Sequence, residues 1–161
     1  MESPFFICYL SKKNMTAEII AKYVHFLCIF AIVGALTSEH LLLKDRMTRK
    51  EIYRLSIIDA IYGVSALLLL GAGLSLWLWL GKPAEFYSKN WIFHLKLTLF
   101  LLIGLLSIYP TIFFIKNRKG KPEEIVDVPK SIKMLLRVEL LLLFIIPLLA
   151  SLMAKGIGFF G

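Results

Sequence analysis

Four long apolar blocks restrict what this 161-residue chain can fold into. They run roughly over residues 19–43, 57–80, 91–115 and 135–154, with polar stretches between them. At about 1.5 Å per residue, about twenty helical residues cross a hydrocarbon core about 30 Å thick, so each block can span a bilayer. Backbone polar groups in lipid must be satisfied within the segment, and no alternating barrel pattern appears. The sequence therefore predicts one all-α domain, an integral membrane up-down four-helix bundle.

The charge of the chain indicates its orientation in the membrane. The formal net charge is +8, but the basic residues are concentrated in two loops between the predicted spans, which argues for topology and against nucleic-acid binding. The first loop holds Lys44, Arg46, Arg49, Lys50 and Arg54, and the second holds Lys116, Arg118, Lys119, Lys121, Lys130, Lys133 and Arg137. The positive-inside rule predicts that both loops are cytoplasmic and both termini lie outside a bacterial inner membrane. The lipid bilayer is the expected partner, and a homo-oligomer is left open.

Two polar stretches and two prolines complete the organisation of the chain. Met15 is an alternative start, which would make residues 1–14 a dispensable tail. Residues 116–130 (KNRKGKPEEIVDVPK) are polar and rich in Gly and Pro, which predicts a mobile cytoplasmic linker. Pro110 and Pro147 fall inside the third and fourth spans, where they predict kinks and not breaks.

Ionisable residues inside spans are candidates for function, because a lone charge in lipid is costly. In the third span, Lys96 shares one side of the helix with Gly104, Ser107 and Thr111, and such small residues mark close helix packing. Lys96 is therefore predicted to face the bundle, with extension of its ammonium to water as the alternative. His94 lies about 160° further round, on an apolar side, which favours an interfacial residue over a ligand.

The first span separates two ionisable residues by depth. His25 shares a face with Ile32, Leu36 and Glu39, but His25 and Glu39 are about 20 Å apart by helical rise and cannot act on one atom. The predicted topology places His25, together with His94 and Lys96, at the outer leaflet.

A second set of ionisable residues is predicted at the inner leaflet. It comprises Glu39, His40, Asp59, Arg137 and Glu139, which carry matched charges. Two interpretations are open for this set: a structural ion-pair network between helices, or a proton-handling site. Asp59 alone is also explained by stabilisation at a helix N-terminus. Lys96, Asp59 and Glu139 are the candidate catalytic residues.

The outer set predicts a haem site. A histidine on a bundle helix that faces another polar group is a common way to hold haem, and His25 is the candidate axial ligand and metal ligand. The second ligand is His94 or Lys96, or the iron stays five-coordinate. Lys96 alternatively pairs with a haem propionate, since a carboxylate in a low-dielectric site needs a cation. The chain has no HExxH, CxxC or phosphate-binding glycine motif.

Four stretches carry a resemblance to a known family. They are YVHFLCIFAIVGALTSEHLLL, DAIYG, GKPAEFYSKNWIFHLKLTLFLLIGLLSIYPT and RVELLLLFIIPLL. Together they resemble a family of uncharacterised bacterial four-helix predicted membrane proteins, a domain of unknown function, over nearly all of residues 22–156. This resemblance implies the fold and brings no activity with it.

A fainter similarity runs to the HemJ-type membrane protoporphyrinogen IX oxidases, which bind haem b. His25 with the following Gly34-Ala35-Leu36 matches their first span, and Arg137 with Glu139 echoes their late helix. Their Trp-Leu-His-x-Lys-Leu pattern is matched, with one residue inserted, by Trp91, His94, Lys96 and Leu97. The chain departs from that family where His40 stands near an expected arginine and where Glu139 alone remains of an Asn-Glu-x-Pro motif.

The sequence thus favours an inner-membrane protein that binds haem b, or another porphyrin, through His25 and Lys96 and has a redox role. The alternative is a non-enzymatic membrane protein, a small transporter or an assembly factor, whose intramembrane charges only hold the helices together.

Overall fold

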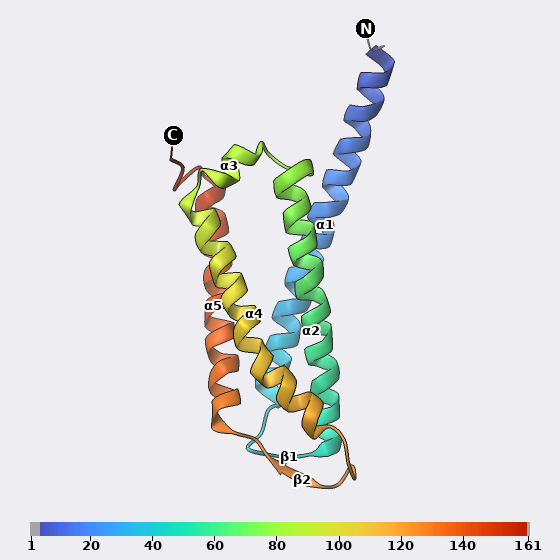
Figure 1. Cartoon of the computed structure of the whole chain (residues 1–161), viewed down its shortest axis with the longest axis vertical. Coiled ribbons are helices and arrows are strands. Elements are labelled where there is room, and N and C mark those ends of the chain that lie inside the picture. The colour runs from blue at the N-terminus through green and yellow to red at the C-terminus, as the bar shows by residue number, and fades with distance from the viewer. Residues whose placement is uncertain (1–3, 161) are drawn as a thin grey trace.

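Four long helices form the molecule. The computed structural model describes the backbone of residues 4–160 and the side chains of residues 15–160. The long helices are α1 (Pro4–Leu42), α2 (Arg49–Ser75), α4 (Trp91–Asn117) and α5 (Lys130–Ala154). They alternate in direction, so that both chain ends lie at one end of the bundle (Figure 1). The predicted all-α up-down bundle is confirmed.

The surface of the bundle is suited to lipid. Each of the stretches Met15–Leu42, Arg49–Leu80, Trp91–Asn117 and Lys130–Ala154 is long and apolar enough to cross a membrane. Large apolar side chains such as Phe30, Leu67, Leu105 and Phe144 are mostly exposed on it. An apolar surface of this extent is a liability in water and is normal in a bilayer. The chain is therefore a multi-pass membrane protein.

The helices pack as two hairpins. Helix α1 packs most extensively on α2, and α4 on α5, whereas α2 meets α4 and α1 meets α5 over smaller areas. We call the contacts of α2 with α4 and of α1 with α5 the seam. The buried core includes Ile32, Leu36, Leu55, Ile103 and Leu136. Helices α4 and α5 run on through Pro110 and Pro147, as predicted.

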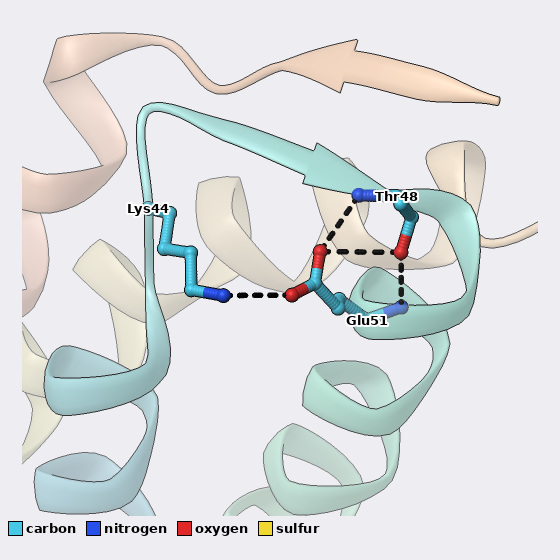
Figure 2. Close-up of polar contacts among 3 residues, drawn as sticks. All are labelled: Lys44, Thr48 and Glu51. Atoms are coloured by element: carbon cyan, nitrogen blue, oxygen red, sulfur yellow. Dashed lines mark hydrogen bonds and ion pairs between the residues drawn. The ribbon is translucent and has the colours of Figure 1, made fainter. Parts of the chain in front are cut away.

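A capping box fixes the start of α2 (Figure 2). The Thr48 hydroxyl accepts a hydrogen bond from the backbone N–H of Glu51 at 3.3 Å, and the Glu51 carboxylate accepts one from the backbone N–H of Thr48 at 2.8 Å. Lys44 binds the other oxygen of this carboxylate at 2.8 Å. Two of the backbone donors that a helix N-terminus leaves free are satisfied in this way.

Two short strands join the loops at the end of the bundle opposite to the chain termini (Figure 1). Strand β1 (Arg46–Thr48) pairs antiparallel with β2 (Ile125–Asp127), with Met47 opposite Val126. Beside the strands, the Arg49 guanidinium binds both carboxylate oxygens of Glu124, at 2.7 and 3.0 Å, and donates to the Asn117 carbonyl at the end of α4 at 2.9 Å. A paired strand was not expected in residues 116–130, which the sequence predicted to be a mobile linker.

The other end of the bundle is also tied together. Helix α2 continues into a π-helical turn, η1 (Leu76–Leu80), and a short helix α3 (Ala84–Ser88) follows. Asn90 is fully buried, caps α4 by accepting from the Ile92 N–H at 2.9 Å, and donates to the Ile157 carbonyl at 3.1 Å. The segment after α5 is therefore held against the start of α4.

Candidate functional site

Polar side chains line the seam at two depths. His25 of α1 and Lys96 of α4 form the outer pair, nearer the chain termini. Glu39 of α1, Asp59 of α2 and Glu139 of α5 form the acid cluster, nearer the strands. Glu39 follows His25 by fourteen positions in α1, which corresponds to a rise of about 21 Å, so the two groups are separate sites.

The outer pair presents a histidine with one unused ring nitrogen. The His25 imidazole lies near the Leu69 backbone, and its Nδ1 is buried and has no hydrogen-bond partner. The ring lies against Gly73, where a Cβ atom would stand 3.6 Å from Cε1 and 3.8 Å from Nδ1. Lys96 is near enough to act on His25 electrostatically. No ion pair among residues 15–160 involves Lys96, so its charge is uncompensated by the described side chains.

His94 is not part of the outer pair. Its side chain is exposed, and its Nε2 lies 2.9 Å from the carbonyl oxygen of Ser88 at the end of α3. Leu101, Leu105 and Ile112, predicted on the same lipid-facing side, are exposed as well. The structure therefore does not bring His94 to His25 as a second ligand.

The acid cluster is buried at the meeting point of three helices. Glu39 is 1% exposed, Asp59 5% and Glu139 0%. Asp59 and Glu139 both act electrostatically on Glu39, and Asp59 acts on Glu139. The side chains of Glu39 and Asp59 turn inward, and the two candidate catalytic acids, Asp59 and Glu139, lie in one site without Lys96.

Hydroxyl groups of α2 and α4 border the acid cluster. The Thr111 hydroxyl donates to Asp59 Oδ1 at 2.9 Å across the seam. Tyr62 is buried one turn beyond Asp59, close enough to all three acids and to Ser107 to interact with them electrostatically. These groups extend the polar lining of the seam toward the middle of the membrane.

The ion-pair network, one of the two interpretations left open for this set, is not formed among the described residues. Within residues 15–160, none of the ion pairs includes a member of the acid cluster, and Arg137 is exposed. Both carboxylate oxygens of Glu139 and Oε1 of Glu39 are buried without a hydrogen-bond partner. The reason is that α5 directs Glu139 into the bundle and Arg137, two residues earlier, away from it.

The sequence of the chain matches the model of a known protein family. The model of the family described as predicted membrane protein DUF2214 matches residues 17–158. The chain belongs to the DUF2214 family. The match covers both the outer pair and the acid cluster, and the family description gives no activity. No curated protein and no solved structure matches this DUF2214 chain.

Some features of this DUF2214 protein were not found from the sequence. The contact of the His25 ring with Gly73 of α2 is one of them. The bond from Thr111 to Asp59 joins residues 52 positions apart. The helical positions of Thr111 and Ser107 beside Lys96 were the available signal, but they did not reveal the partner.

Proposed function

We propose that this DUF2214 protein binds haem b at the outer pair and has a redox role in the membrane. The observation that carries the proposal is the buried Nδ1 of His25, a ring nitrogen without a hydrogen-bond partner beside an uncompensated ammonium. A buried polar atom costs free energy unless it finds a partner, and iron is a partner suited to a neutral imidazole nitrogen.

The surrounding residues fit this role. The Leu69 backbone lies near the His25 ring, and a backbone group in that place can help to hold the orientation of a ligating histidine. Gly73 of α2 lies against the ring on the side of Cε1 and Nδ1. Lys96 supplies the cation that a propionate requires in a low-dielectric site. Haem, when bound, would supply one-electron chemistry; with His94 turned away, His25 is the single histidine ligand of this proposal.

We also propose the orientation of the chain. The concentration of Lys and Arg in the loops that carry β1 and β2 supports a cytoplasmic position for that end, and an external position for both termini. The membrane would be the bacterial inner membrane. In this orientation the outer pair lies toward the exterior and the acid cluster toward the cytoplasm.

An absorbance spectrum tests the haem proposal. Protein extracted from its membrane, after expression with ample haem supply, is expected to show a Soret band. His25→Ala should abolish the band, Lys96→Ala should weaken haem retention, and His94→Ala should leave both unchanged. A colourless protein, or a band that survives His25→Ala, would refute the proposal and favour the transporter or assembly-factor alternative.

A further inference from the structure

The acid cluster serves no purpose in the haem proposal, because it lies about 21 Å from His25 along α1. We propose that Glu39, Asp59 and Glu139 form a proton-binding site, which exchanges protons with water at the end of the bundle that carries β1 and β2. The site requires neither haem nor the outer pair.

The first argument is the charge balance of the site. The groups facing it are Glu39 from α1, Asp59 and Tyr62 from α2, Thr111 and Ser107 from α4, and Glu139 from α5. His40 follows Glu39 in α1, and its buried Nδ1 has no hydrogen-bond partner. No lysine or arginine is among them. Three carboxylates without a cation cannot all remain ionised in a low-dielectric space, since the loss of hydration and their mutual repulsion both oppose it. Protons are the simplest means of neutralising them.

The second argument is the state of Glu139. Its side chain is completely buried and neither of its oxygens has a hydrogen-bond partner, so nothing in the described part of the chain compensates a negative charge there. A protonated carboxyl group is far less costly to bury than a carboxylate. Intramembrane acids of this kind are rare unless they have a function.

The third argument concerns why the acid cluster would bind a proton and not a metal ion. Among residues 15–160, no group of three or more His, Cys, Asp or Glu side chains is placed to hold a metal ion. Asp59 Oδ1 already accepts the Thr111 hydroxyl, as a carboxylate does whose charge is stabilised locally. A proton needs only one oxygen, so Glu39 and Glu139 can each hold one in the present geometry.

A short route connects the site to water. Ser56 is buried one helical turn before Asp59, on the side of the strands, and Arg118 Nη1 lies 3.5 Å from its hydroxyl oxygen. Arg118 itself is exposed at the end of α4. Asp59 is therefore about one turn, roughly 5 Å along α2, from a serine whose hydroxyl lies beside an exposed side chain.

Infrared spectroscopy tests the proposal directly. The purified full-length protein in lipid nanodiscs would be titrated with alkali while the carbonyl stretch of protonated carboxyl groups is recorded. We expect the wild type to show this band at neutral pH and to lose it on raising the pH. Glu139→Gln should remove part or all of the band, because the amide keeps the shape and cannot release a proton. Glu123→Gln, in the exposed loop, is the matched control and should leave the band unchanged.

Three results would overturn the inference. They are the absence of a protonated carboxyl band throughout the titration, a band that persists unchanged in Glu139→Gln, and a band whose intensity follows the sodium concentration at fixed pH. Should Glu139→Gln not be recovered as folded protein, Glu39→Gln provides the same comparison. Because the readout is a carboxyl vibration, a colourless protein would refute the haem proposal and leave this result intact.

Discussion

Replacement of Glu139 by methionine is expected to stabilise the protein. The glutamate side chain is fully buried and both carboxyl oxygens lack a hydrogen-bond partner. Burial of a polar group without a hydrogen bond costs about 1–3 kcal/mol on the scale of protein mutational data, and an apolar side chain of similar length and volume removes that cost. Glu139→Met should therefore raise the free energy of unfolding by about 1–3 kcal/mol. Glu139→Gln, which keeps a buried polar group, should change it much less.

The measurement is thermal unfolding of the purified protein in one detergent at one pH. For a chain of this size, 1 kcal/mol corresponds to about 2–4 °C in Tm, so Glu139→Met should melt about 2–12 °C above the wild type. Glu123→Met, at an exposed position, is the matched control and should stay within about 0.5 kcal/mol. Glu139→Met should also lose the proton exchange proposed for Glu139, so that this variant gains stability and loses function.

A lower Tm for Glu139→Met would refute this reasoning. It would mean that the carboxyl group makes a favourable interaction in the folded protein, with a bound ion or a polar partner. The buried oxygens of Glu139 would then have a partner that compensates a negative charge, and they would no longer support the proposed proton site.

Two further predictions concern the loops at the β1–β2 end. Gly120→Ala should lower the free energy of unfolding by about 1–3 kcal/mol, because Gly120 has a φ of 127° and a Cβ there would lie 2.8 Å from Arg49 Cδ. Gly63→Ala lies inside α2 with no atom within 4 Å of the new Cβ, and it should instead raise the free energy of unfolding by up to about 1 kcal/mol. Both variants would be measured in the same thermal assay. The Arg49 guanidinium holds the pKa of Glu124 below its usual range, so the stabilisation from this pair is present above pH 4.5 and is lost as the pH falls through the lowered pKa of the folded protein. Glu124→Gln should therefore make the stability of the protein depend less on pH in the acid range. An unchanged dependence on pH would show that the pair contributes nothing.

The sequence by itself determined the spans and the faces they turn inward. The length of each apolar block defines a crossing, and the fixed 100° step of a helix places His25 with Glu39, and Asp59 with the small residues of α2, on one side. These properties are local, because a helix in lipid satisfies its own backbone and needs no partner to form.

Only the tertiary structure decided which groups meet across the seam. The bond from Thr111 to Asp59, the isolation of Glu139 from Arg137 and the pairing of β1 with β2 each depend on how helices distant in the chain rotate and pack. Helical periodicity determines the direction of a side chain relative to the axis of its own helix, but it does not determine which residue of a neighbouring helix lies opposite. For this reason a set of matched charges in the sequence became, in the folded chain, three acids without a cation.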